Sequence, residues 1–353
     1  MSQRAVSSDK LPEKVRIGVI GCGDIARTQH IPAILKSEDA ALAALCDVQG
    51  EQVRSLAAQY GVPGYTDAHV MMKECVMDAV IVSTPPWVTP RLTEAALKRG
   101  LDVLCEKPMA LTIEEAKHVA DVERETGRHV QLGFTYRHDP LLEQLRDWIQ
   151  ADALGHPLVY RLGIYDEIWD PQGNPEHYAR LYATMQHGCP SIHDGAHNAD
   201  FLHFLTGSQV MDVHAFGLQS RPEFPCSNYD TSIIRFENGD LAKLEIGWFY
   251  PVMPRGEFEV LGPKGYASYD RLARSVRMTD NQGTRELRDT EDWWKLCFKL
   301  QLKKFVQCIR EDKPCMPGCA EGIYSLTLCK QIEAEITKNR ETGARGYDGY
   351  RNV

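Results

Sequence analysis

A pair of glycines near the N-terminus constrains the fold more than any other feature of this sequence. Gly21 and Gly23 follow an apolar run over residues 15–20 and precede residues 24–35, whose apolar spacing is that of a helix. A strand, a tight turn and a helix in this order direct backbone N–H groups at a phosphate. The first glycine permits the turn, and the second leaves room for a pyrophosphate. The pattern predicts a dinucleotide site at Gly21, Gly23, Asp24 and Ile25.

An acidic residue ends the second predicted strand. Residues 41–46 are apolar, and Asp47 follows them. A carboxylate at this place accepts hydrogen bonds from both ribose hydroxyls of NAD and repels the 2′-phosphate of NADP. No Lys or Arg follows until Arg54, so no nearby cation would neutralise that phosphate. The sequence favours NAD, although a strand-end aspartate also serves as an ordinary turn residue.

Strand and helix patterns alternate through the first third of the chain. Thr89 and Pro90 are predicted as the cap and first turn of one helix, and Thr112 with Glu115 as the capping box of another. Alternation on short loops indicates an α/β domain with a parallel, doubly wound sheet. Further strands are predicted at residues 79–83, 102–105 and 129–134, and further helices at 51–60, after Asp67, at 89–99 and up to Gly127.

From about residue 158 the pattern changes to longer alternating runs. Alternation with a hairpin-like turn at residues 237–240 indicates an α+β domain on a large, open, mostly antiparallel sheet. Residues 292–338 return to helical spacing. Strands are predicted at residues 158–165, 212–217, 232–236, 241–248 and 257–261. We divide the chain into a flexible segment (1–14), an NAD-binding domain (15–136) and a domain for substrate binding and oligomerisation (137–353).

Composition excludes several classes of partner. The net charge of −9 argues against nucleic acid or an anionic membrane as the main partner. No segment has the apolar length of a signal peptide or a membrane-spanning helix. The eleven cysteines are odd in number, and without a secretion signal they indicate reduced, buried thiols. We expect a soluble cytoplasmic protein with no nucleic-acid or membrane partner.

Several short motifs follow the predicted strands. They are Thr84-Pro85-Pro86, Cys105-Glu106-Lys107-Pro108, Gly133-Phe134-Thr135-Tyr136-Arg137-His138-Asp139-Pro140 and the segment ending His197-Asn198-Ala199-Asp200. Together with the glycine turn they resemble the Gfo/Idh/MocA oxidoreductase family over about residues 15–342. The resemblance implies a Rossmann domain that binds NAD, a C-terminal domain with a large open sheet, and a small sugar or polyol substrate. It also implies a homodimer or homotetramer.

The resemblance also implies roles for individual residues. Lys107 would lie near the nicotinamide and the substrate hydroxyl, where it can orient the reacting oxygen and take part in proton transfer. His197 would act on that hydroxyl as acid or base. Cofactor contacts are expected from Thr84, Pro85, Glu106 and Lys107. Besides Lys107 and His197, we name further candidate substrate contacts by their position in the second domain alone: Tyr136, Arg137, Asp166, Trp169 and Asp194.

The second catalytic segment departs from the family pattern. Dehydrogenases of the family usually carry an Asp four residues before the His, and this sequence has His193 there. Asp194 is one step off, and with Ser191 it forms a capping pattern for the following helix. We therefore treat His193 as a catalytic substitute for the carboxylate or as a substrate contact. Thr89 also departs, because many relatives carry a His there.

Three functions are compatible with these residues. The first is a dehydrogenase in which His197, aided by Lys107, removes the hydroxyl proton while hydride passes to C4 of NAD. The second is a redox-neutral lyase or glycoside hydrolase that oxidises the sugar transiently, with His193 as an additional base. The third is a non-catalytic NAD-binding sensor. His193 and His197, four residues apart, could also hold a metal with His187 or Asp194, but the resemblance gives no general support and we expect no metal.

Overall fold

Two compact units make up the described part of the chain, which in this computed structural model comprises residues 13–252, 256 and 258–343. The first unit contains the residues up to Glu106, His118–Gly133 and Phe298–Gly318. The second contains Lys107–Lys117, Phe134–Cys297 and the residues from Cys319 onward. The predicted flexible segment, residues 1–14, lies outside the described residues except for its last two.

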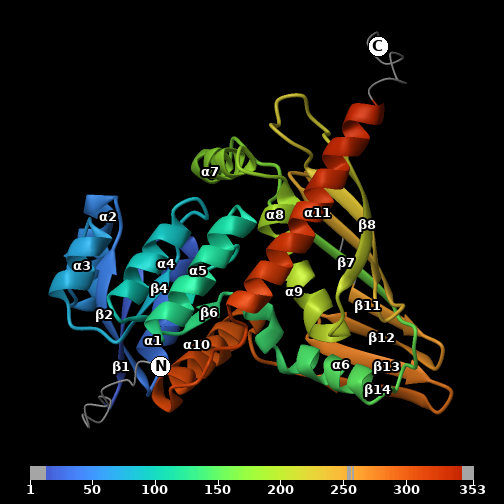
Figure 1. The fold of residues 1–353 in the computed structure, drawn as a ribbon, viewed down its shortest axis with the longest axis horizontal. Helices are drawn as coiled ribbons and strands as arrows, with labels where there is room; N and C mark the ends of the chain where they lie inside the picture. Colours follow the sequence, from blue (N-terminus) through green and yellow to red (C-terminus); the bar gives the residue numbers. More distant parts are fainter. Residues whose placement is uncertain (1–12, 253–255, 257, 344–353) are drawn as a thin grey trace. The chain divides into compact units, whose positions relative to one another are not determined.

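Six strands form the sheet of the first unit in the order β3-β2-β1-β4-β5-β6, and every neighbouring pair is parallel (Figure 1). The strands are β1 (Val15–Ile20), β2 (Ala40–Cys46), β3 (Gly64–Tyr65), β4 (Ala79–Val82), β5 (Asp102–Cys105) and β6 (Val130–Leu132). The strand order reverses between β1 and β4. Such a switch point opens a crevice beyond the carboxyl ends of the strands, where ligands bind. The predicted doubly wound Rossmann sheet is confirmed.

Helices connect the strands of this sheet. They are the π-helical turn η1 (Ala26–His30), α1 (Ile31–Lys36), α2 (Gly50–Tyr60), α3 (Ala68–Glu74), α4 (Thr89–Lys98) and α5 (Ile113–Thr126). Thr112 caps α5 as predicted, because the Glu115 N–H donates to the Thr112 hydroxyl at 3.1 Å. The Glu115 carboxylate accepts a hydrogen bond from that hydroxyl, not the backbone bond of a capping box. The predicted cap at Thr89 is wrong. The helix begins at Thr89 itself, and its hydroxyl hydrogen-bonds back to the carbonyls of Thr84 and Pro85.

The core of the first unit includes a helix from the end of the chain. From α10 (Trp293–Glu311), Leu302, Phe305 and Val306 are buried in one cluster with Val15 and Ile17 of β1. The strands β4 and β5 are buried at every position, which explains why they read as continuous apolar runs in the sequence.

Eight strands form the sheet of the second unit, in the order β14-β13-β12-β11-β7-β10-β9-β8. They are β7 (Val159–Asp166), β8 (Val210–Leu218), β9 (Tyr229–Phe236), β10 (Leu241–Trp248), β11 (Phe258–Gly262), β12 (Gly265–Asp270), β13 (Ser275–Asp280) and β14 (Gly283–Arg288). Only the pair β7–β10 is parallel among the described pairings. The mostly antiparallel sheet is confirmed, whereas β12–β14 were not predicted; β14 is exposed along its whole length and offers no buried stripe.

The second unit also contains helices, several of which lie against this sheet (Figure 1). They are the 3-10 turn η2 (Thr135–His138), α6 (Pro140–Gln150), α7 (Pro175–Met185), α8 (Pro190–His193), α9 (Gly195–Thr206) and α11 (Cys319–Gly343). The helix α9 is buried over most of its length and packs against α11, which also contacts β8. None of the helices in the described ranges has the length and apolar character needed to cross a membrane. All eleven cysteines are free thiols.

Candidate active site

The glycine turn lies between β1 and the helical segment that begins at Asp24. Gly21 has a φ of +89°, and a Cβ there would lie 2.2 Å from the carbonyl oxygen of Ser83, so only glycine fits. A Cβ at Gly23 would meet no heavy atom within 4 Å. Asp24 and Ile25 are exposed at the start of the helix. The turn thus combines a conformation that requires glycine with an open approach to its backbone, as a pyrophosphate needs.

The carboxylate of Asp47 lies beside this turn. One oxygen accepts a hydrogen bond from the backbone N–H of Cys22 at 2.7 Å, and the other accepts one from Gln49 at 2.9 Å. The side-chain amide of Gln52 donates to the Cys22 carbonyl at 2.8 Å. Asp47 is half-buried. It therefore joins the end of β2 to the glycine turn, the position at which the sequence predicts a ribose contact.

The loops after β4 and β5 carry the other predicted cofactor residues. Thr84 Oγ1 lies 2.9 Å from Thr89 Oγ1, and the Pro85 carbonyl accepts a hydrogen bond from the Thr89 N–H. Glu106 Oε1 lies 2.7 Å from Nε2 of His30, a buried residue of η1 that sequence reasoning missed. The helix after the glycine turn and the end of β5 are thus held together by one side-chain contact.

In the second unit, Lys107 pairs with Asp194. Its Nζ lies 2.9 Å from Asp194 Oδ1 and 3.3 Å from the backbone carbonyl of His193. The indole N–H of Trp248 donates to the other oxygen of Asp194 at 2.8 Å. Burial would raise the pKa of Asp194, but the charge of Lys107 and these hydrogen bonds outweigh it and hold the pKa below its usual value. Asp194 is therefore an ionised partner for Lys107.

This arrangement corrects the predicted helix cap. The sequence predicts that Ser191 and Asp194 cap the following helix, and that prediction is wrong. The Ser191 hydroxyl donates instead to Asp230 at 2.8 Å, and the Asp194 side chain makes no cap hydrogen bond to α9. The partners of both residues come from distant strands and loops, which local spacing cannot reveal. The carboxylate at Lys107 comes from Asp194, one residue after the position that the family pattern indicates.

The two histidines pack on different aromatic rings. His193 stacks on Trp248 with centroids 5.9 Å apart, and His197 stacks on Tyr136 at 4.0 Å. Burial lowers the pKa of His193 to about 4. Burial and the charges of Lys107 and Arg271 lower that of His197 well below its usual value. Both imidazoles are therefore neutral at pH 7, and His193 Nε2 and His197 Nδ1 are buried without a hydrogen-bond partner among the described residues.

The remaining predicted substrate residues lie in different surroundings. Asp166 ends β7, and burial together with the charge of Asp194 raises its pKa. Arg137 lies in a buried ion pair with Asp200, its Nε 3.0 Å from Asp200 Oδ2. Trp169 belongs to an aromatic cluster with Tyr178, Phe224 and Phe249. In residues 13–252, 256 and 258–343, no three or more His, Cys, Asp or Glu side chains are grouped to hold a metal ion.

Glu167 is a candidate that sequence reasoning missed. Its φ is +59°, a costly conformation for a residue other than glycine, and its carboxylate lies 2.6 Å from His177 Nε2. Burial and the charges of Asp194 and Asp166 raise its pKa to about 7. No sequence pattern marks it, because both the backbone conformation and the neighbouring charges arise only in the folded chain.

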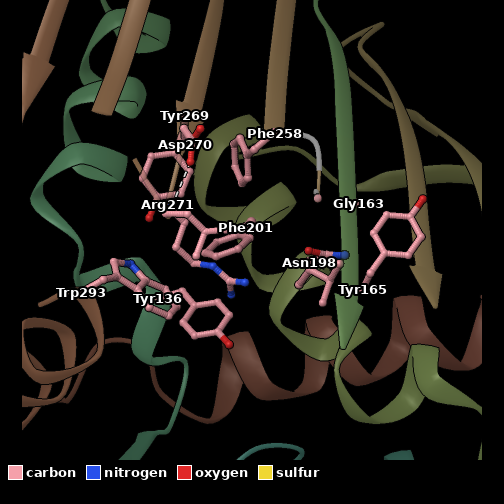
Figure 2. A pocket seen from close by; sticks show the side chains of 13 residues that line it. Tyr136, Gly163, Tyr165, Asn198, Phe201, Phe258, Tyr269, Asp270, Arg271 and Trp293 are labelled. Atoms are coloured by element: carbon pink, nitrogen blue, oxygen red, sulfur yellow. Dashed lines mark hydrogen bonds between the residues drawn. The ribbon is translucent and has the colours of Figure 1, made fainter. Parts of the chain in front are cut away.

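A pocket of the second unit adjoins His197. It encloses about 660 Å³ of space, part of it open to solvent, and is lined by aromatic rings from η2, α9, β11 and the start of α10 (Figure 2). The ring of Tyr136 lines this pocket and also stacks on His197. Arg271 directs its guanidinium into the pocket, with Cζ 4.8 Å from the centroid of the Trp293 ring. Arg271 was not predicted, because nothing in the sequence links its turn to this pocket.

Both units match models of one protein family. Residues 15–134 match the model described as an oxidoreductase family with an NAD-binding Rossmann fold, and residues 142–268 match the GFO/IDH/MocA C-terminal domain. A protein of Rhizobium meliloti, the rhizopine catabolism protein MocA, is 32% identical, and the alignment covers 92% of this chain and 96% of that protein. The chain belongs to the Gfo/Idh/MocA oxidoreductase family. The resemblance predicted from the sequence is confirmed, and this family member is an NAD-dependent oxidoreductase.

Two further relatives of this Gfo/Idh/MocA oxidoreductase extend the comparison. The myo-inositol 2-dehydrogenase of Thermotoga maritima is 26% identical over 92% of this chain and 97% of its own length. The crystal structure of the WlbA dehydrogenase from Bordetella pertussis, in complex with NADH and UDP-GlcNAcA, has a TM-score of 0.77 at 22% identity. That alignment covers 92% of this chain and 97% of the crystallised one. At this identity the structural likeness establishes the shared fold.

Proposed function

We propose that this enzyme oxidises a secondary hydroxyl of a sugar, inositol or related polyol, or reduces the corresponding ketone. The proposal rests on the Lys107–Asp194 ion pair and on His197, a neutral imidazole on which the charge of Lys107 acts. Nδ1 of His197 has no hydrogen-bond partner among the described residues. Lys107 directly follows Glu106 in the chain, two residues beyond the end of β5. Ligands of open parallel sheets bind beyond the carboxyl ends of the strands, and Lys107 follows one of these ends. The myo-inositol dehydrogenase relative supports a polyol as the substrate class.

The residues of the first unit fit NAD. Gly21 and Gly23 would hold the pyrophosphate at the helix start, and Asp47 the ribose hydroxyls, with Glu106 and Thr84 lining the crevice. NAD, when bound, supplies the hydride acceptor at nicotinamide C4.

The second unit supplies the proton chemistry in our proposal. Asp194 pairs with the ammonium group of Lys107, and a cation at this place stabilises the oxyanion that develops as a hydroxyl loses its proton. His197 is neutral at pH 7 and can accept that proton, since its Nδ1 has no partner among the described residues. In the reverse direction the same two groups donate to a ketone oxygen. We propose His193, whose ring stacks on Trp248, as a substrate contact.

We further propose a cytoplasmic homodimer or homotetramer without nucleic-acid or membrane partners. The net charge of −9 supports the absence of nucleic acid. On the large sheet, Phe216 is 61% exposed and Ile233 is 40% exposed, on strands whose alternate residues are buried. Exposed apolar side chains on a sheet face are typical of an interface between copies of one chain. The comparisons give no support to a redox-neutral lyase or to a non-catalytic sensor.

The proposal is tested by NADH formation at 340 nm with a panel of inositols, aldoses, glycosides and sugar acids. We expect stoichiometric NADH with at least one member of the panel. The Lys107→Met variant should retain NAD binding, measured by fluorescence titration, and lose turnover. Tight NAD binding with no NADH from any sugar or polyol would contradict the proposal.

A further inference from the structure

Arg271 places its guanidinium in the pocket beside His197, where the charge of Asp166 acts on it but forms no ion pair with it among the described residues. It lies in the turn between β12 and β13, and its guanidinium faces the rings of Trp293 and Tyr136 at 4.8 and 5.8 Å (Figure 2). Within the described residues, no carboxylate pairs with it and no oxygen accepts a hydrogen bond from it. A guanidinium carries five N–H donors, and those of Arg271 face a pocket that is partly open to solvent, where the acceptors of a ligand can replace water.

The neighbouring acidic residue is committed elsewhere. The Asp270 carboxylate accepts hydrogen bonds from the backbone N–H groups of Leu272 and Ala273 at 2.9 and 2.8 Å. These bonds close the turn on itself and fix the backbone from which Arg271 projects. The aromatic contacts then hold the planar guanidinium. Arg271 is therefore positioned before any ligand arrives, which lowers the entropy cost of binding one.

A second polar group without a partner lines the same pocket. Asn198 of α9 is 1% exposed, and its Nδ2 has no hydrogen-bond partner in the described part of the chain. Figure 2 places Asn198 across the pocket from Trp293, with the Arg271 guanidinium between them. The amide of Asn198 and the guanidinium of Arg271 thus both present hydrogen-bond donors to this pocket. Such donors bind a ligand group that is rich in acceptors.

The pocket belongs to the proposed substrate site. Tyr136 joins the two, since its ring lines the pocket and stacks on His197 at 4.0 Å. The charge of Arg271 also acts on His197 and on Asp166, as does that of Lys107. Two cations thus act on this region, and Asp194 is the ionised partner of only one of them, Lys107.

We propose that Arg271 recognises an oxyanion, a carboxylate or a phosphate, on the sugar substrate. The proposal rests on the proposed function and narrows its substrate class to acidic sugars such as uronic acids or sugar phosphates. The oxyanion accepts hydrogen bonds from the guanidinium in a planar, two-point geometry that lysine cannot reproduce. The rings of Tyr136 and Trp293 shield part of the guanidinium from solvent, and a partly shielded contact is stronger than one in bulk water.

The test compares matched sugars on the NAD-loaded full-length protein. D-glucuronate, D-glucose 6-phosphate and neutral D-glucose differ mainly in the presence and type of the oxyanion. We expect the better of the two acids to exceed glucose in kcat/KM by about 10- to 100-fold, from the strength of charge-assisted hydrogen bonds. Preference for glucuronate identifies a carboxylate, and preference for the phosphate identifies a phosphoryl group.

Variants separate recognition from folding. Arg271→Gln should lower kcat/KM for the preferred acid by about 10- to 100-fold, mainly through KM, and leave glucose within about threefold. Arg271→Lys should recover only part of the loss. The matched control is Arg146→Gln, because Arg146 also stacks over an aromatic ring, that of Phe204 at 4.5 Å, but does not line this pocket. It should leave all three substrates unchanged.

The outcomes distinguish this inference from the proposed function. If neutral polyols give NADH as well as the acids do, or if Arg271→Gln affects acidic and neutral substrates equally, the oxyanion proposal is wrong while the dehydrogenase stands. If no sugar gives NADH, calorimetry of glucuronate and glucose 6-phosphate binding decides. Binding that Arg271→Gln abolishes supports the oxyanion site even though the dehydrogenase proposal fails. Absence of binding overturns both.

Discussion

The glycine turn of the first unit and the Lys107 cluster of the second are built in opposite ways. At the turn, Gly21 and Gly23 offer their backbone, and Asp47 adds one carboxylate at the end of the next strand. All three follow strands that the sequence pattern marks. At the cluster, Lys107 from the end of β5 meets Asp194 from the junction of α8 and α9, and Trp248 from β10 completes the arrangement. A backbone site can be recognised from a motif. A side-chain site depends on which distant elements pack together.

This comparison predicts that substitutions in the cluster affect chemistry and leave cofactor binding intact. Asp194→Asn removes the charge that faces Lys107 and should lower kcat by about 100- to 1,000-fold, the range of a positioned acid–base group. The neighbouring His193→Gln should lower it by less than about tenfold, since the carboxylate at Lys107 remains. Steady-state kinetics and the Kd for NAD measure both effects. A larger loss of kcat for His193→Gln than for Asp194→Asn would show that His193, at the position of the family Asp, is the more important residue for catalysis.

Substitutions in the glycine turn should separate conformation from ligand access. Gly21→Ala forces a Cβ to 2.2 Å from the Ser83 carbonyl at a φ of +89°, and should cost at least about 1–3 kcal/mol of stability. Gly23→Ala meets no atom within 4 Å and should melt within about 1 °C of the wild type while the Kd for NAD rises about tenfold.

The control for this pair is Gly100→Ala. Gly100 has a φ of +79° with nothing within 4 Å, so it reports the conformational cost without a clash. Differential scanning fluorimetry with and without NAD provides both readouts. Equal losses of stability for Gly21→Ala and Gly100→Ala would show that the close contact with Ser83 adds nothing to the conformational cost.

The carboxyl of Glu167, on which the charge of Asp194 acts, should titrate near neutral pH. Its pKa in the folded chain is about 7, above the ordinary value of 4.5. A raised folded pKa adds stability that is complete below about pH 4.5 and is lost as the pH rises through about 7. Glu167→Gln lacks this loss, so its Tm relative to the wild type should increase from pH 5.5 to 8.5, by the equivalent of about 1–3 kcal/mol.

Glu245→Gln is the matched control for the pH experiment. The Lys243 charge and the hydroxyls of Tyr165 and Tyr229 lower the pKa of Glu245 despite the opposing effect of burial. Its contribution changes only at more acidic pH, so the difference in Tm from the wild type should stay flat between pH 5.5 and 8.5. A flat profile for Glu167→Gln as well would show that the carboxyl of Glu167 is already ionised at pH 5.5.

Much of the fold could be predicted because its signals are local. Buried parallel strands such as β4 and β5 give continuous apolar runs, and Thr112 with Glu115 predicts the start of α5. Strands without a buried stripe, such as β14, gave no signal. The cap expected at Thr89 failed for a related reason. A hydroxyl near a helix start can hydrogen-bond either to the first turn of the helix or to the loop before it. The Thr89 hydroxyl donates to the carbonyls of that loop.

The sequence by itself determined the Rossmann unit and its cofactor NAD, and it predicted a role for Lys107, because each depends on residues adjacent to a strand end. Only the tertiary structure decided that Asp194 faces Lys107, that His197 is neutral, and that Arg271 enters a pocket beside it. These facts depend on burial and on charges brought together from distant segments. A one-residue shift from His193 to Asp194 is ambiguous along the chain, and the distances to Lys107 and Trp248 resolve it.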